Sequence, residues 1–468
     1  MTIDLHPLEW IPIALYMAGI LVVGLVGRRG GSDEADFILG GRALTLPAFV
    51  ATLVTTWYGG ILGVGEFTYL YGLSNWVVFG LPYYVFALLF AWLLAPRVRA
   101  SGLLSIPDQL YHHHGTAGGV LGALFTFCMT LPAPYILMVG LLLQVVTGWP
   151  LWFCLVLGTA VSIVYVLTGG FRAVVRTDRL QFVLMFAGFA VLLVTLVATH
   201  GGWNFLVANL PPLHLTWHGG NDIDYLLTWG FIALWTFVDP GFHQRCYAAK
   251  TERTARRGIL VSVGFWLVFD ALTTATGLYA RALMAAEGSE AALAFPLLGH
   301  QALPPLLSGL FLTGLLATIM STVDSFALLS AITLGHDLAA RFLRWPWRVT
   351  PVQAGLVVTG VVSVALAITV PSVIQLWLVM GNVFIPPLLL PLAGCYFPWL
   401  KIPPGWTVAL LAGSFTVAMA WLAMAIAASP DLVNLVYPLG LPPMYPGMAA
   451  ALLLQAGGMI RAGRLSSR

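Results

Sequence analysis

The chain has 468 residues, of which 59% are hydrophobic and only 8% are charged, and its formal net charge is +3. Soluble domains carry about 25% charged residues, so this composition excludes an ordinary soluble protein and predicts an all-α polytopic membrane protein. The loops leave no room for an appended kinase, nucleotide-binding or nucleic-acid-binding domain. We therefore expect one membrane domain over residues 1–468, with no enzymatic activity and no nucleic-acid partner.

Thirteen apolar runs follow one another along the chain and predict thirteen transmembrane helices in a lipid bilayer. They lie near residues 10–27, 47–72, 76–95, 117–147, 150–168, 179–199, 225–244, 258–284, 304–335, 350–370, 372–397, 405–428 and 441–460. No basic region precedes the first run, so we expect a retained helix there and not a cleaved signal peptide.

The positive charges test this count. All of the 21 Lys and Arg residues except Arg281 fall in alternate loops or tails. We therefore expect a multi-pass protein of the cell (inner) membrane. By the positive-inside rule, its N-terminus lies outside the cell and its C-terminus lies in the cytoplasm, which requires an odd number of spans. The basic Arg245–Arg257 group is expected to be a solvated cytoplasmic loop.

Two runs are interrupted in the middle by residues that weaken a helix. The second contains VTTWYGGILGVG and the seventh contains WTFVDPGFHQR. Gly loosens a turn and Pro removes an amide hydrogen bond, so both helices are expected to break at membrane depth. Broken helices five spans apart are typical of inverted-repeat secondary transporters. The expected repeats are 47–199 and 225–397, with accessory helices at 10–27, 405–428 and 441–460.

The ninth run is unusually polar for a transmembrane helix. At 100° per residue, about a third of its circumference carries the hydroxyls of Thr318, Ser321, Thr322 and Ser325. Asp324 lies roughly 60° beyond Ser321, and a carboxylate at such depth costs roughly 2.5–3.5 kcal/mol on insertion scales. This pattern favours a cation site. The alternative is that the hydroxyls bond back to their own helix.

Five motifs, in order along most of the chain, carry a resemblance to a known family. They are FILGGRALTLP, TTWYGGILGVGEFTYLYG, LTGGFRAVVRTDRLQ, DPGFHQRCYAAKTERTARRG, and ATIMSTVDS followed by HD. The chain resembles the sodium/solute symporter family of sugar, proline, sialic acid, iodide and choline carriers. That resemblance implies a leucine-transporter-like fold with one helix before the ten-helix core and two after it. It also implies sodium as the coupling ion, no organic cofactor, and function as a monomer.

Carried over from the family, one sodium site lies between the breaks in the second and ninth spans. Its expected ligands are the carbonyls of Thr55, Tyr58 and Thr318 and the hydroxyls of Ser321 and Thr322. A hard cation takes several oxygen ligands, and unwound backbone supplies free carbonyls.

Some relatives hold a second sodium ion, and the matching positions here are Asp178, Ser321, Asp324 and Ser325. The family pattern has a hydroxyl where this chain has Asp324. Asp324 and Asp178 can bind sodium, share a proton, or form a structural ion pair with Arg176 or Arg179. These alternatives stay open from the sequence.

The expected substrate-binding or gating residues are Trp57, Tyr58, Glu66, Trp235 and Asp239. Aromatic faces suit a quaternary amine, a sugar or an apolar group, and core packing is the alternative for each Trp. Asp239 can instead cap the half-helix that follows it, and Glu66 can clamp neighbouring backbone.

Together these residues predict a sodium-coupled secondary active symporter that imports a small organic solute by alternating access. The solute is expected to be a zwitterion, an organic cation, a sugar or a carboxylate. The alternatives are a proton-coupled transporter of the same fold, a non-transporting membrane sensor and an integral membrane enzyme.

Overall fold

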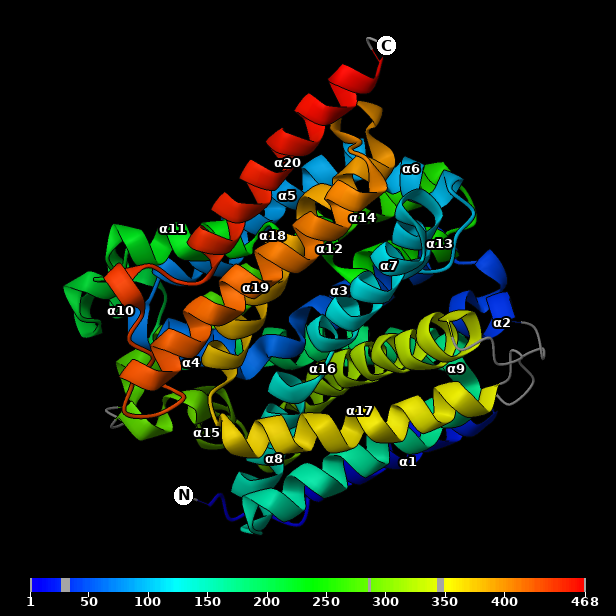
Figure 1. Ribbon diagram of the computed structural model, residues 1–468. Coiled ribbons are helices and arrows are strands. Elements are labelled where there is room, and N and C mark those ends of the chain that lie inside the picture. The colour runs from blue at the N-terminus through cyan, green and yellow to red at the C-terminus, as the bar shows by residue number, and fades with distance from the viewer. Residues whose placement is uncertain (1, 27–33, 285–287, 343–348, 467–468) are drawn as a thin grey trace.

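The computed structural model describes residues 2–26, 34–284, 288–342 and 349–466, and within these ranges the chain is helical with no β-strand. Long helices lie beside one another in a single bundle, with the two termini at opposite ends of the view (Figure 1). The basic residues Arg28, Arg29, Arg344 and Arg348, which contribute to the expected topology, lie outside the described residues.

Ten α-helices lie among the described residues before residue 210. They are α1 (Trp10–Val26), α2 (Glu34–Leu39), α3 (Leu46–Trp57), α4 (Ile61–Tyr71), α5 (Leu81–Leu93), α6 (Ala95–Ala100), α7 (Ile106–Met129), α8 (Ala133–Thr147), α9 (Leu151–His200) and α10 (Trp203–Asn209). The first half also contains short 3₁₀-helices, η1 (Gly40–Arg42), η2 (Tyr58–Gly60) and η4 (Pro212–Leu215), and one short π-helix among the described residues, η3 (Trp76–Gly80).

Ten more lie among the described residues from Ile223 onward. They are α11 (Ile223–Ile232), α12 (Trp235–Val238), α13 (Pro240–Ala248), α14 (Glu252–Leu283), α15 (Ala294–Ala302), α16 (Pro305–Ile332), α17 (Val349–Thr369), α18 (Val373–Tyr396), α19 (Pro404–Ala428) and α20 (Met444–Ser466). The short turns are η5 (Gly288–Leu293), η6 (Thr333–Phe342), η7 (Pro398–Leu400) and η8 (Pro438–Gly440).

Both expected helix interruptions are present. The second run divides into α3, η2 and α4, and the seventh into α11, α12 and α13. At the second interruption Asp239 has extended backbone (φ −66°, ψ 115°), and its side chain accepts a hydrogen bond from the amide of Phe242. Asp239 therefore caps α13, and Pro240 begins that helix where its missing amide hydrogen bond costs nothing.

Kinks inside two of the long helices fall near expected boundaries. The fifth and sixth runs are two helical stretches within α9, and the non-helical backbone of Gly170 (φ 51°, ψ −149°) separates them. A Cβ on Gly170 would lie 2.7 Å from the carbonyl oxygen of Phe37, so only glycine fits this bend. α7 begins at Ile106, where Ser105 caps it through the amide of Asp108, and its backbone is non-helical at Gly115 (φ 76°, ψ −171°), just before the expected start of the fourth run.

Nine helical segments of the described residues are long and apolar enough to cross a membrane, and Trp10–Val23 and Leu151–Leu167 form shorter apolar helices. The count of thirteen spans and the inverted repeat remain predictions. At the centre of the bundle, α16 packs against α1, α3, α8, α9 and α17. The Ser/Thr-rich stretch of α16 therefore faces protein on all sides and is buried throughout.

Candidate functional site

The break between α3 and α4 lies directly against the hydroxyl face of α16. The hydroxyl of Thr322 donates a 2.7 Å hydrogen bond to the carbonyl of Thr56. A Cβ on Gly59 would lie 1.9 Å from Oγ1 of Thr322, so the glycine at the break is what allows this approach. The two segments that the sequence assigned to one cation site are therefore neighbours in space.

The five residues of the expected sodium site are all buried, with at most 4% of their surface exposed. The hydroxyls of Thr55 and Thr318 donate to carbonyls of their own helices, at Ala51 (2.9 Å) and Gly314 (2.7 Å). Those hydroxyls follow the back-bonding alternative, and the expected role of both residues uses only their carbonyls. The Thr322 and Ser321 hydroxyls instead reach other helices, and an oxygen that donates its hydrogen keeps lone pairs for a cation.

Asp178 of α9 joins α3 to α16. The hydroxyl of Ser321 donates to its Oδ1 at 2.6 Å, and the hydroxyl of Thr52 donates to its Oδ2. None of these three side chains is exposed. The carboxylate thus holds the Ser321 hydroxyl in a fixed orientation beside the helix break.

A buried guanidinium lies on the other side of Thr52. Nη2 of Arg245 donates to the hydroxyls of Thr52 (3.1 Å) and Thr56 (2.8 Å). It also donates to the hydroxyl of Ser325 at 2.7 Å, and Nη1 donates to the side chain of Gln244 at 3.1 Å. Arg245 is completely buried. The guanidinium therefore links α13 to both α3 and α16.

Arg245 corrects two expectations from the sequence. The Arg245–Arg257 group is not a uniformly solvated loop, because α13 turns its first basic residue into the bundle while Arg253 and Arg257 remain exposed. Arg176 and Arg179 are both exposed and do not pair with Asp178. At 100° per residue, the side chains of Arg176 and Arg179 project from α9 at about 160° and 100° from the direction of the Asp178 side chain.

Asp324 points away from the group around Arg245. Its Oδ2 accepts a hydrogen bond from the hydroxyl of Tyr165 in α9, whereas its Oδ1 has no hydrogen-bond partner among the described residues. The next residue, Ser325, faces Thr56 and Arg245 instead. Two residues that the sequence grouped into one possible site therefore face different neighbours.

A cavity of about 110 Å³ lies beside the two helix breaks. Its polar lining includes Asp239, Asp270 and Thr56, and the glycines Gly60 and Gly241 come from the two breaks. Ten aromatic residues line it: Trp57, Tyr58, Phe79, Tyr83, Tyr135, Trp229, Trp235, Phe242, Phe326 and Trp377. The aromatic rings contact one another, for example Trp57 with Tyr83 at 5.1 Å between ring centroids.

The structure brings four of the expected substrate or gate residues to this cavity: Trp57, Tyr58, Trp235 and Asp239. Glu66 is not part of its lining. The indole nitrogen of Trp235 donates to Oδ2 of Asp239 at 3.0 Å, so this carboxylate caps α13 and faces the cavity at once. Asp270 of α14 accepts a hydrogen bond from Tyr84 and also lines the cavity.

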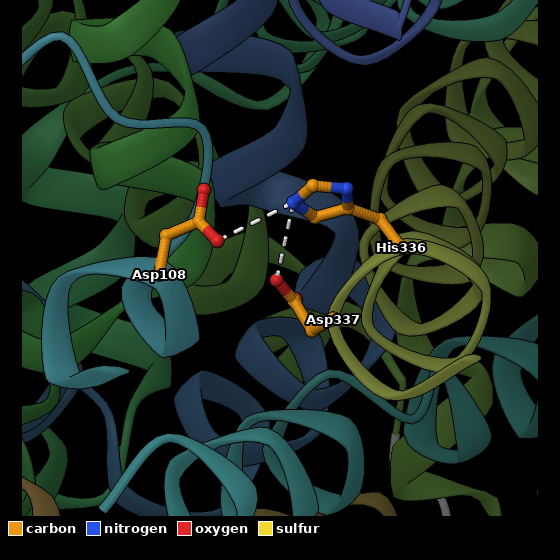
Figure 2. Close-up of side chains that lie close together, drawn as sticks. All are labelled: Asp108, His336 and Asp337. Carbon is orange, nitrogen blue, oxygen red and sulfur yellow. Dashed lines mark hydrogen bonds and ion pairs between the residues drawn. The ribbon is translucent and has the colours of Figure 1, made fainter. Parts of the chain in front are cut away.

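A second polar cluster joins the start of α7 to η6, beyond the hydroxyl face of α16 (Figure 2). Nε2 of His336 lies 3.4 Å from Oδ1 of Asp108 and 3.6 Å from Oδ1 of Asp337. Nη1 of Arg341 approaches the same Asp108 oxygen at 2.5 Å, and Ser105 donates to Asp337 at 2.6 Å. His and two carboxylates are a possible metal donor set, but the guanidinium already neutralises Asp108, so the cluster fits an ion-pair network.

Comparison with known proteins decides the family. The family described as Sodium:solute symporter family matches residues 37–391 of the chain. The chain belongs to this family. The resemblance predicted from the five motifs is thereby confirmed, and the chain is a multi-pass membrane protein.

Several known transporters are similar along most of the chain. The osmoregulated proline transporter OpuE of Bacillus subtilis is 27% identical over 463 residues, which covers 91% of each protein. The high-affinity choline transporter 1 of Drosophila melanogaster is 26% identical over 406 residues, covering 78% of this chain and 63% of the relative.

The fold is also that of a solved symporter. The substrate-bound, outward-open structure of a Na⁺-coupled sialic acid symporter superposes with a TM-score of 0.80 at 16% identity, covering 98% of both chains. The nucleobase-cation-symport-1 family transporter Mhp1 superposes with a TM-score of 0.60 at 14% identity, covering 92% of this chain and 96% of that one. At these identities the likeness shows a shared fold.

Sequence reasoning missed three kinds of residue at the site. Thr52 and Thr56 lie in α3, as Thr55 does, and carry the hydroxyls that bind Arg245. A 3–4-residue spacing from Thr52 to Thr56 was the available signal, because it places both on one helix face. Arg245 and Tyr165 gave no local signal, since their burial depends on how α13 and α9 pack.

Proposed function

We propose that this symporter-family protein couples inward sodium movement to the import of a small organic solute. The observation that carries the proposal is the contact of Thr322 with the α3–α4 break. It gathers hydroxyls of α16 and carbonyls of unwound backbone, the oxygen ligands that a hard cation takes. Thr55, Tyr58, Thr318, Ser321 and Thr322 are the proposed sodium ligands.

Sodium binding at this contact would link the ion to the solute. The break that supplies the Thr55 and Tyr58 carbonyls also supplies Trp57 and Gly60 to the cavity wall. A bound ion would therefore fix the position of the same backbone that shapes the solute pocket. One positive charge moving inward gains about 2.3 kcal/mol per 100 mV of membrane potential, in addition to the sodium gradient. Alternating access would then release the sodium ion and the solute on the inner side of the membrane.

The cavity lining favours a solute that carries a positively charged group. Among the described residues, its lining contains two carboxylic acids, Asp239 and Asp270, and no Lys, Arg or His. Aromatic faces attract an ammonium group, and desolvation inside a cavity strengthens that attraction to about 2 kcal/mol or more. We therefore propose an organic cation or a zwitterion, placed with its amine near Trp57, Trp235 and Asp239. The names of the proline and choline relatives agree with such a solute.

A thermal-stability screen of the purified protein tests the proposal. Choline, proline, glucose, sialic acid and pyruvate are each added in sodium chloride and in potassium chloride. We expect choline or proline to raise the melting temperature in sodium, since a ligand at 100 times its Kd stabilises by about 2.7 kcal/mol. The Trp57→Leu variant should lose the shift, whereas Trp152→Leu, an exposed tryptophan away from the cavity, should keep it.

Two results would replace the proposal by an alternative. Equal stabilisation in potassium and sodium, with uptake driven by a pH gradient alone, would establish proton coupling. Binding without any uptake into proteoliposomes would establish a sensor.

A further inference from the structure

The aromatic cavity has a second carboxyl group, that of Asp270 in α14. Its side chain is buried and lines the cavity together with Asp239. The two carboxyl groups reach the cavity from different helices, because Asp239 lies at the second break and Asp270 lies in the middle of α14. The cavity wall therefore contains an acidic group that an amine placed near Asp239 leaves unassigned.

Asp239 already has partners that stabilise a negative charge. It accepts hydrogen bonds from the amide of Phe242 at 2.9 Å and from the indole nitrogen of Trp235 at 3.0 Å. The guanidinium of Arg245 is also close, since a Cβ on Gly241 would lie 2.8 Å from Oδ1 of Asp239 and 3.7 Å from Nη1 of Arg245. The protein itself thus stabilises the carboxylate at the second break.

The polar neighbours of Asp270 are tyrosine hydroxyls. Tyr84 of α5 donates to its Oδ2. The hydroxyl of Tyr58 lies beside the same carboxyl group and donates to the carbonyl of Trp266 at 3.0 Å. Among the described residues, no Lys, Arg or His forms an ion pair with Asp270. An ionised carboxyl group accepts hydrogen bonds and donates none, so Asp270 is suited to a donor group that the solute brings.

The indole of Trp57 contacts aromatic side chains near both carboxyl groups. Its ring centroid lies 5.5 Å from that of Phe242 and 5.3 Å from that of Trp266. Phe242 belongs to α13, which Asp239 caps. Trp266 lies one helical turn before Asp270, on the same face of α14. An ammonium group held against Trp57 near Asp239 therefore leaves the Asp270 side of the cavity for the other end of the solute.

We propose that Asp270 binds the second polar group of the solute and selects a hydrogen-bond donor there, a hydroxyl or a second ammonium, against a carboxylate. A hydroxyl or an ammonium would donate to the Asp270 carboxylate in a charge-assisted hydrogen bond. A carboxylate on the solute would instead lie against a carboxylate of the protein in a buried cavity, and such like-charge contacts are unfavourable. This inference rests on the proposed function and narrows its solute to an amino alcohol or a diamine.

Choline and glycine betaine are a matched pair of probes for this selection. Both carry a trimethylammonium group, and they differ in the hydroxyl or carboxylate at the other end. Isothermal titration calorimetry of the purified protein in sodium chloride measures the affinity for each. We expect choline to bind at least about 10-fold more tightly than glycine betaine, because a polar site rejects an analogue that leaves its groups unpaired. Ethanolamine and glycine repeat the comparison with a primary amine.

Three variants assign the selection to Asp270. Asp270→Asn should lower the ratio of the two affinities to about 1, because an amide offers a donor as well as an acceptor. Asp239→Asn should weaken both probes and keep the ratio, since the probes share the ammonium group. Asp222→Asn, on an exposed loop, should change neither affinity. Size-exclusion chromatography establishes whether Asp270→Asn folds, and if it does not, the ratios of the wild type decide.

The outcomes separate this inference from the proposed function. Equal affinities in the wild type, tighter binding of the carboxylate probes, or an unchanged ratio in folded Asp270→Asn would overturn the role of Asp270 and leave the proposed function in place. Binding of proline without binding of choline or ethanolamine would do the same, because proline carries a carboxylate. If no amine among these probes binds in sodium, the proposed function fails and the inference fails with it.

Discussion

The hydroxyl of Thr322 in α16 donates a 2.7 Å hydrogen bond to the carbonyl oxygen of Thr56 in α3. Thr56 lies just before the interruption of α3, where backbone carbonyls lose their helical partners. The contact therefore ties an uninterrupted helix to an interrupted one at the point where a cation would find free oxygens.

Removing the two hydroxyls of α16 at this contact should raise the sodium requirement. The double variant Ser321→Ala and Thr322→Ala should need at least about 10-fold more sodium for half-maximal uptake, because two oxygen ligands worth about 1 kcal/mol or more each are lost. Sodium titration of uptake into proteoliposomes measures this. Thr313→Ala is the control, since that hydroxyl donates to Gly309 of its own helix. An unchanged sodium requirement in the double variant would reject the assignment of these ligands.

Adding a methyl group at the break should separate the two helices. Gly59→Ala would place its Cβ 1.9 Å from Oγ1 and 2.2 Å from Cβ of Thr322, and neither atom can retreat along a flexible chain. We expect near-complete loss of sodium-dependent uptake and a lower melting temperature. Gly264→Ala is the matched control, because nothing lies within 4 Å of its added Cβ. Normal uptake by Gly59→Ala would show that this close approach is unnecessary.

The two roles of Asp239 can be separated by choice of substitution. Asn caps a helix about as well as Asp, so Asp239→Asn should keep the thermal stability of the protein while weakening the binding of choline. Asp239→Ala should also lose about 1 kcal/mol of stability, because the amide of Phe242 loses its acceptor. Binding isotherms and melting curves of both variants supply the test. Equal choline affinity in Asp239→Asn and the wild type would restrict the carboxylate to capping.

The cluster between α7 and η6 should contribute to stability. Asp108→Asn leaves Arg341 and His336 without their shared carboxylate in a buried position, and breaking such a pair costs about 3 kcal/mol. Thermal unfolding in detergent should show a clearly lower melting temperature. Asp222→Asn, on an exposed loop, should leave it unchanged. A bound divalent metal would give a different result, namely stabilisation of the wild type by Zn²⁺ or Mn²⁺ that chelators reverse.

The sequence predicts the features whose causes are local. Gly59-Gly60 and Asp239-Pro240-Gly241 weaken a helix wherever they occur, and both interruptions are present in the structure. The Ser/Thr face of α16 is likewise readable from 100° spacing. The burial of Arg245 cannot be predicted from the sequence in this way, because the positive-inside rule assigns every basic residue to a loop. The packing of α13, which begins after the helix break at Asp239, brings Arg245 between α3 and α16.

Asp270 and Asp324 illustrate the same limit. Each is an acidic residue in an apolar helix, which indicates an inward-facing side chain but not the neighbour that it meets. Asp270 reaches the aromatic cavity because α14 packs against α3, α4 and α5. Asp324 meets Tyr165 because α9 crosses α16 there. Such partners follow from helix packing, which the sequence alone does not specify.

The most direct test of sodium-coupled import is uptake of radiolabelled choline and proline into proteoliposomes that contain the purified protein. An inward sodium gradient is imposed together with a potassium diffusion potential, negative inside. We expect one of the two solutes to accumulate transiently above its external concentration. Accumulation should be lost when an impermeant cation such as N-methylglucamine replaces sodium outside and the potassium diffusion potential is kept. Accumulation that is equal with and without sodium, or no uptake of either solute, would contradict the account.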